Sequence, residues 1–308
     1  MSSTAPVEVP AVAPRAPCPC GSGRRYKACH GKRRHGAAVG VAVNPRPFAG
    51  RVDEPDLVAL REIVPSATAP LVLADGSGRE VLLGTVLPVR WPAMVRSDGR
   101  MLIGLQTEPR SDDAGRDLGQ ALQAVLAAEP GQGLDQLPAP DPGPRLADLL
   151  DPAPIQITVH PGFDWWLEGV EEPGEDAVAA LADANATVVP TARLQSVEAA
   201  YWCRIGDRAH LRWALPYDEE PLLDALARLH AAKSLTVGPQ TRFIGAFRTC
   251  GLLIPVWDLP MDREADATEG PAAELAERLA EAYADGTPLT ADQRAARAGL
   301  VSRQLTLR

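Results

Sequence analysis

The 308-residue chain has no run of about 18 apolar residues, so the sequence offers no helix that would span a membrane. Its N-terminus has no basic segment followed by an apolar one, which argues against a secretory signal peptide. Only five cysteines occur, and three of them lie within residues 18–29, so a disulfide framework is not expected. We therefore expect a cytoplasmic protein with free thiols.

Acidic residues are scarce in one part of the chain. The net charge is −9, yet residues 1–36 contain seven basic groups and only one acidic group, Glu8. This head therefore carries +6 and the remainder carries −15. A basic head implies an anionic partner, whereas the acidic remainder repels nucleic acid and anionic lipid or only supports solubility.

The cysteine cluster lies in the segment CPCGSGRRYKACHG at residues 18–31. Three thiols and one imidazole form a full tetrahedral ligand set for zinc: Cys18, Cys20, Cys29 and His30. Four protein ligands leave no position for water, so we expect a structural Zn²⁺ rather than a catalytic one.

This segment resembles the SEC-C motif, the zinc-binding tail of the SecA motor, and the resemblance implies the same four ligands. In SecA the tail contacts the secretion chaperone SecB and has been associated with ribosomes and anionic lipid. A comparable partner would meet the basic side chains of Arg24, Arg25, Lys27, Lys32, Arg33 and Arg34. The chain is not itself a SecA ATPase, because it lacks a G-x-x-x-x-G-K-[ST] phosphate loop.

Composition predicts the domain organisation. Residues 1–17 are rich in Pro and Ala and are expected to be disordered. The knuckle and its basic tail occupy 18–36, and a Gly/Ala/Val/Pro linker occupies 37–50. An α+β domain is expected over 51–308, with Pro-rich residues 137–144 as a candidate division into two halves.

Within this body we expect four antiparallel hairpins, each followed by an amphipathic helix, which gives an α+β fold with antiparallel sheets. The expected hairpins pair 93–96 with 100–107, 155–160 with 163–167, 200–205 with 209–215, and 242–248 with 252–257. The helices follow Ser111, span about 175–184, follow Asp218, and carry Leu275, Leu279 and Ala282 on one face. Extra strands are expected at 71–74 and 81–87.

From about residue 47 the chain is similar to an uncharacterised actinobacterial family that carries the same N-terminal knuckle. The segments VVPTARL (188–194), AYWCRIG (200–206) and VWDLP (256–260) carry this resemblance. Members are sometimes labelled preprotein translocase SecA, through the knuckle alone. The family has no assigned activity, so the resemblance implies no mechanism.

Cys203 and His210 would form a thiol–imidazole pair if the strand register placed them opposite each other. A loop of residues 206–207 gives that register, whereas a loop of 206–208 places Cys203 opposite Leu211. The longer loop sorts similar residues onto the same face, so it is favoured, and Cys203 is then a core thiol. This register also predicts a face made of Trp202, Arg204, His210 and Arg212. Such a face would bind an anionic ligand or acidic peptide, or would be covered by a helix or paired with acids.

His160 and Asp164 offer an imidazole–carboxylate pair, or else a turn that directs Trp165 and Trp166 into the core. The leading functional hypothesis is a non-catalytic adaptor whose knuckle docks on an anionic protein or ribosomal partner. An enzyme of unknown reaction in the body, with the knuckle as a targeting tag, is the alternative. An RNA-binding knuckle is weaker, because the acidic body lacks a basic groove, so RNA contact is expected only as part of a ribosome.

Overall fold

The computed structural model describes residues 46–138, 143–302 and 305–306. These residues contain helices and two six-stranded sheets, so the α+β class is confirmed. Strand pairs are antiparallel except for β2 with β4 and β10 with β12, which are parallel. No helix in the described part of the chain is long and apolar enough to cross a membrane.

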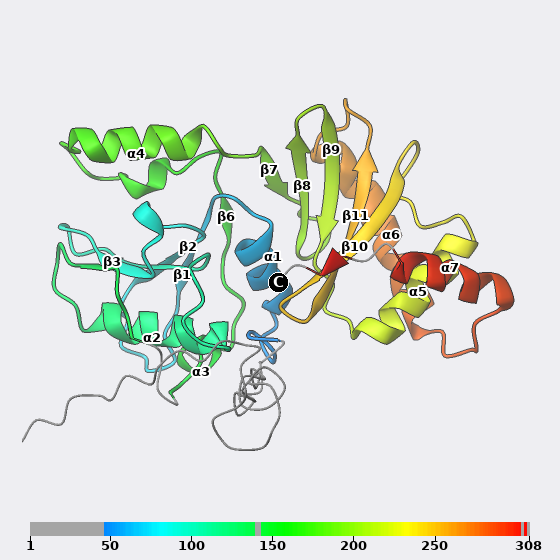
Figure 1. Cartoon of the computed structure of the whole chain (residues 1–308), viewed down its shortest axis with the longest axis horizontal. Coiled ribbons are helices and arrows are strands. Elements are labelled where there is room, and N and C mark those ends of the chain that lie inside the picture. The colour runs from blue at the N-terminus through cyan, green and yellow to red at the C-terminus, as the bar shows by residue number, and fades with distance from the viewer. Residues whose placement is uncertain (1–45, 139–142, 303–304, 307–308) are drawn as a thin grey trace, which may run out of the picture. The chain divides into compact units, whose positions relative to one another are not determined.

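The first sheet has the strand order β5-β3-β4-β2-β1-β6. Strands β1, β2, β3 and β6 of this sheet are labelled in Figure 1. It belongs to a segment comprising α1 (Glu54–Glu62), β1 (Ala67–Leu71), β2 (Val81–Gly84), η2 (Pro88–Arg90), β3 (Ala93–Val95), β4 (Met101–Gly104), α2 (Ala114–Leu126), β5 (Gly133–Leu134), α3 (Leu146–Leu149), β6 (Thr158–Val159), η3 (Asp164–Trp166) and α4 (Glu175–Asn185).

The second sheet has the strand order β12-β10-β11-β9-β8-β7. Its segment comprises β7 (Thr191–Arg193), β8 (Ala200–Ile205), β9 (Arg208–Trp213), α5 (Glu219–Ala231), β10 (Arg242–Thr249), β11 (Leu252–Leu259), α6 (Asp266–Ala284), α7 (Ala291–Val301) and β12 (Leu305–Thr306). The chain changes sheets between Val159 and Thr191, whereas residues 137–144 lie between two strands of the first sheet. The domain boundaries themselves stay a prediction.

Three of the four expected hairpins are present, namely β3–β4, β8–β9 and β10–β11. The hairpin expected over 155–167 was wrong, because β6 pairs with β1 and residues Asp164–Trp166 form a 3₁₀ turn. The helix expected after Ser111 is α2, but its N-cap is Asp113, whose carboxylate accepts hydrogen bonds from the backbone N–H groups of Gly115 and Arg116.

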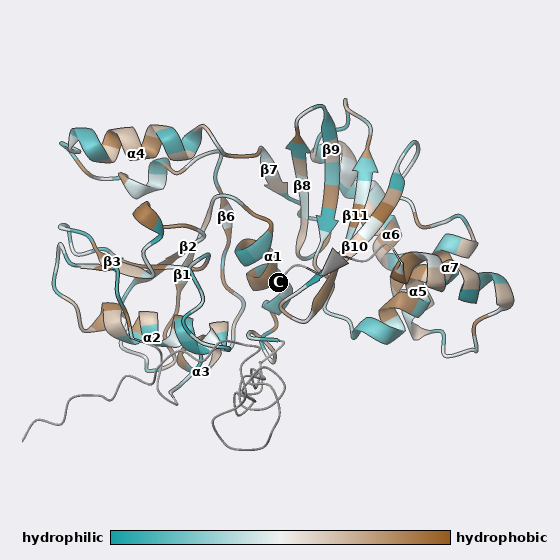
Figure 2. Ribbon diagram, viewed as in Figure 1, coloured by the Kyte–Doolittle hydropathy of each residue, from teal (hydrophilic) through white to brown (hydrophobic). Residues whose placement is uncertain are grey.

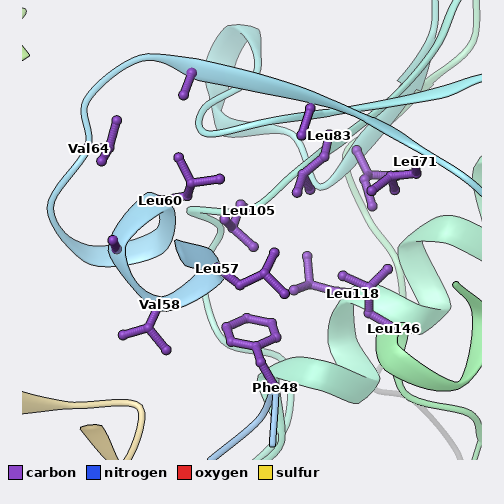
Figure 3. Packing of buried hydrophobic residues seen from close by; sticks show 14 of the residues in the cluster. Phe48, Leu57, Val58, Leu60, Val64, Leu71, Leu83, Leu105, Leu118 and Leu146 are labelled. Carbon is purple, nitrogen blue, oxygen red and sulfur yellow. The ribbon is translucent and has the colours of Figure 1, made fainter. Parts of the chain in front are cut away.

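The core of the first segment lies between its sheet and the helices α1 and α2. Figure 3 shows Phe48 against Leu57, with Leu118 and Leu146 nearby, and all four side chains are buried. Phe48 sits in the turn of residues 47–50, so the end of the expected linker is packed into the body. Burial of a Phe or Leu side chain contributes about 1.5–3 kcal/mol, so this turn is held firmly.

A second core lies between the second sheet and the helices α5 and α6. Trp202, Leu211 and Trp257 point to this side and are buried among the leucines of both helices. Strand β9 alternates hydrophilic and hydrophobic residues along its length, as Figure 2 shows. Successive side chains of a strand point to opposite faces of the sheet, and only one face of β9 is covered by α5 and α6. The hydrophilic residues of β9 therefore lie on the face away from α5 and α6.

Helix α1 also reaches the second sheet through a buried carboxylate. The Tyr201 hydroxyl donates a hydrogen bond to Asp56 Oδ1 at 2.6 Å. Arg193 donates to both Asp56 oxygens, at 3.0 and 2.8 Å. This cluster joins α1 to β7 and β8 on the face that carries the hydrophilic residues of β9, because Tyr201 is paired with Arg212.

Candidate functional site

The predicted zinc ligands Cys18, Cys20, Cys29 and His30 lie outside the described residues, as do Arg24, Arg25, Lys27, Lys32, Arg33 and Arg34. Their donor set suits Zn²⁺, since thiolate and imidazole are its preferred ligands. Within the described part of the chain, no group of three or more His, Cys, Asp or Glu side chains could hold a metal ion. Zinc binding therefore stays a prediction about residues 18–30.

The register of β8 and β9 differs from the favoured one. Cys203 is paired with His210 and Arg204 with Ala209, so the loop contains only Gly206 and Asp207. Gly206 has φ +58°, which suits a glycine in the first position of a two-residue hairpin turn. The expectation of a three-residue loop was wrong.

This register separates the four residues predicted to share a face. Trp202 is only 5% exposed on the helix side, and its indole N–H donates to the Arg263 carbonyl at 2.9 Å. Arg204 lies over that indole at 5.2 Å and pairs with Glu264 at 2.6 Å. His210 and Arg212 lie on the opposite face, so the predicted mixed face does not exist.

The same register aligns a thiol, an imidazole and a carboxylate on three neighbouring strands. Cys203 on β8 is opposite His210 on β9, which is in turn opposite Asp258 on β11. His210 Nδ1 is 3.0 Å from Asp258 Oδ1, although the ring N–H is not aligned for a good hydrogen bond. The order matches that of a nucleophile, a base and an orienting acid.

The three groups are not arranged as an active nucleophile. The Cys203 thiol is 2% exposed, and burial raises its pKa, so it is protonated at neutral pH. Burial also lowers the pKa of the His210 imidazole, against the opposing effect of Asp258. No hydrogen bond joins the thiol to the imidazole in the described part of the chain. Cys203 is therefore a core thiol, as predicted.

A cavity of about 770 Å³ lies beside β1 and β2 of the first sheet. Its apolar walls include Pro70, Val72, Leu82 and Trp165, and its polar lining includes Thr68, Arg79, Arg100, His160 and Glu168. We call it the His160 cleft. Its size and its mainly apolar walls are those of a binding site for a small molecule or a peptide segment.

His160, Arg79, Arg100 and Glu168 in the lining of the His160 cleft each have a polar partner. His160 Nε2 is 2.8 Å from Thr68 Oγ1, and Arg100 pairs with Glu168 at 3.1 Å. Trp165 donates its indole N–H to Ser66 Oγ at 3.0 Å, which fixes the ring against the strand β2. Burial lowers the pKa of His160, so a neutral imidazole faces the cleft at neutral pH.

Asp164 does not take part in this site. Its side chain is exposed, and no hydrogen bond or ion pair to His160 occurs in the described part of the chain. The partner of His160 is instead Thr68, which lies 92 residues earlier in the sequence. The alternative reading, a turn that directs Trp165 and Trp166 into the core, is confirmed, since both indoles are buried.

Two family models match the chain. A family of unknown function, DUF5926, matches residues 47–308 and so covers nearly the whole described body. The chain belongs to the DUF5926 family. The SEC-C motif matches residues 15–32, which include all four predicted zinc ligands. A search of curated proteins and a search of solved structures found no match.

These matches confirm the two resemblances inferred from the sequence: a SEC-C segment fused to an uncharacterised domain. The DUF5926 match begins at residue 47, next to the buried Phe48 that anchors the start of the body. Both sheets and the His160 cleft therefore belong to the DUF5926 region, and the family name supplies no activity for them.

Proposed function

We propose that this DUF5926 protein is a non-catalytic adaptor or binding protein. Its SEC-C segment binds a structural Zn²⁺ through Cys18, Cys20, Cys29 and His30 and docks on an anionic partner such as a ribosome or a secretion chaperone. The body binds a second ligand, for which the His160 cleft provides a site. The supporting features are a docking motif at one end and a cleft in the body.

The make-up of the cleft is the observation that carries this proposal. Its apolar walls can take up a ligand, while its imidazole is bonded to a hydroxyl and its guanidinium to a carboxylate. The described cysteines are not placed in it: Cys203 is buried in the second sheet, and Cys250 contacts Glu62 at 3.7 Å. This arrangement supports binding better than covalent chemistry.

Docking is tested with the whole chain and a Cys18→Ser/Cys20→Ser form, in which zinc cannot be held. Both forms are compared for co-sedimentation with ribosomes and for recovery of partners from a cell extract. We expect the ligand-deficient form to lose at least one partner that the intact protein retains. Equal recovery of every partner by both forms would refute docking through the knuckle.

An enzyme in the body is the second candidate, and the neutral imidazole that lines an open cleft is the observation that favours it. The purified protein would be incubated with a small-molecule cell extract, and the changes followed by mass spectrometry. A metabolite that is consumed by the intact protein but not by a His160→Gln variant would establish catalysis. Unchanged extract would leave the adaptor as the better description.

A further inference from the structure

A basic surface lies on the face of the second sheet that points away from α5 and α6. It carries Arg208, His210 and Arg212 from β9, with Asp258 from β11 and Arg242 from β10. Helix α1 contacts the same face through Asp56 and Tyr201, and Tyr201 is paired with Arg212 across β8 and β9. We call the surface formed by Arg208, His210, Arg212, Arg242 and Asp258 the Arg212 face.

The charges of the Arg212 face are not balanced. One carboxylate, Asp258, is shared by two guanidinium groups, Arg242 at 2.8 Å and Arg208 at 3.6 Å, while the His210 imidazole 3.0 Å away has a pKa lowered by burial. Arg212 makes no hydrogen bond or ion pair with any residue of the described part of the chain, and it is half-buried. A guanidinium that has no carboxylate partner and still reaches solvent can pair with an external oxyanion.

A small cavity of about 280 Å³ lies directly beside this guanidinium. Its floor and rim are apolar and are formed by Ile63, Ile244, Phe247 and Val256, with Arg212 and His210 on one wall. Ile244 at its rim and Ile205 on the same face are exposed by 37% and 40%. The cavity is below the usual size range for a drug-sized ligand, so it fits one or two side chains of a longer binding partner.

We propose that the Arg212 face binds an acidic peptide segment of a partner protein. One apolar side chain of the peptide enters the cavity, and a neighbouring carboxylate pairs with Arg212. Further acids approach Arg208 and Arg242, whose shared carboxylate leaves excess positive charge. The acidic residue at the cavity edge, Glu62, does not oppose this binding strongly, because Arg61 pairs with it at 3.2 Å.

An inorganic anion would pair with Arg212 but would make no apolar contact with the floor of the cavity. An apolar side chain would fill the cavity but would not pair with Arg212. The chemistry of this surface therefore favours a ligand that combines both, as an acidic peptide with an apolar anchor does. This inference deepens the proposed adaptor role by naming a partner class for the body, and it involves neither the knuckle nor the His160 cleft.

The test is selection of peptides from a random display library on the intact chain. We expect the enriched peptides to combine Asp or Glu with a Leu, Ile or Phe residue. Synthetic copies would then be measured by fluorescence anisotropy, with an expected loss of at least tenfold in affinity for the Arg212→Gln variant. The control is Arg90→Gln, because Arg90 is exposed, belongs to the first segment, and its side chain makes no hydrogen bond or ion pair with the described residues.

A second variant, Ile244→Ser, tests the apolar contact at an exposed position where folding should not depend on it; weaker peptide binding is expected. Both variants are checked by thermal unfolding. The Cys18→Ser/Cys20→Ser form should bind the peptides normally, so a failure of knuckle docking and a failure of this inference are distinguishable. The inference is overturned if acidic–apolar peptides are not enriched, or if they bind Arg212→Gln unchanged. The inference would also be overturned if millimolar inorganic phosphate displaced the bound peptides completely and Ile244→Ser did not change their affinity. That result would indicate a site for a small anion.

Discussion

The Asp56 carboxylate is the clearest place to test how the two sheets are held together. It accepts hydrogen bonds from the Tyr201 hydroxyl and from two nitrogens of Arg193, at 2.6 to 3.0 Å. The Asp56 and Arg193 side chains are 10% and 23% exposed, so the pair is mostly but not fully shielded from water. An Asp56→Asn variant keeps the volume and removes the charge.

Loss of one partner of a buried ion pair costs about 3–5 kcal/mol, because the other charge is left uncompensated. Since Arg193 is partly hydrated, we expect Asp56→Asn to lower the free energy of unfolding by about 2–4 kcal/mol. Tyr201→Phe removes one hydrogen bond to a charged group and should cost about 1.5–3 kcal/mol. The double variant should lose less than the sum, because both changes act on the same carboxylate.

Urea unfolding followed by circular dichroism and tryptophan fluorescence gives these free energies. The pH dependence gives a second readout, because burial and the adjacent Asp56 raise the pKa of the Tyr201 phenol. The folded state therefore keeps this proton when the unfolded state has lost it, and stability falls as the pH rises above about 10. The Tyr201→Phe variant should lack that part of the decline.

A change of less than about 0.5 kcal/mol in Asp56→Asn would refute the reasoning, because substitutions that disturb no structural feature fall in that range. Strict additivity of the two single changes would also refute it. Both outcomes would mean that the contact between α1 and the second sheet depends on apolar packing alone.

Two glycines inside helices should respond oppositely to alanine. A Cβ on Gly119 would lie 2.3 Å from a backbone oxygen of the facing loop, so Gly119→Ala should destabilise by about 1–3 kcal/mol. A Cβ on Gly299 meets nothing within 4 Å, so Gly299→Ala should raise the free energy of unfolding by about 0.5–1 kcal/mol. Both changes are measured by urea unfolding, and a change of the same sign in the two variants would contradict the packing described around these glycines. Burial raises the pKa of the Cys203 thiol and raises that of the Cys250 thiol to about 11. Iodoacetamide at pH 8 should therefore alkylate both thiols slowly until urea is added. Peptide mass spectrometry measures the extent of alkylation. Alkylation of either thiol at the unfolded rate would contradict the burial of Cys203 or the partial burial of Cys250. Elemental analysis should find one zinc ion per intact chain and markedly less zinc in a Cys18→Ser form. Equal zinc content in the two forms would refute the proposed set of zinc ligands.

Local pattern was sufficient to predict most of the elements. The hairpins β8–β9 and β10–β11 and the helix α5 follow from short apolar runs, turn residues and helical spacing near in sequence. Helix α7 was missed although its signal was present, since Thr290 and Gln293 form a capping box. Helix α1 was missed as well, although Pro55 stands in its first turn.

The predictions from the sequence were wrong where contacts between residues far apart in the chain determine the strand register or the lining of a cleft. The favoured β8–β9 register grouped Trp202 with arginines, whereas the α1 carboxylate of Asp56 draws the Tyr201 hydroxyl to the other face. The turn itself held the local signal, because a Gly-Asp pair is typical of a two-residue hairpin loop. The sequence indicated His160 as a candidate site residue but did not predict the cleft around it. Thr68 and most residues that line the walls come from strands far from His160 in the sequence.

The short strand β12 has a practical consequence for handling this protein. It pairs with β10 at Phe247 and Arg248, and β10 would otherwise be an outer strand with unpaired N–H and C=O groups. Such a bare strand can recruit the same strand of a second molecule. Shortening the chain at Val301 would therefore favour oligomers and aggregates during purification, so an affinity tag is better added beyond Arg308 than substituted for the final residues.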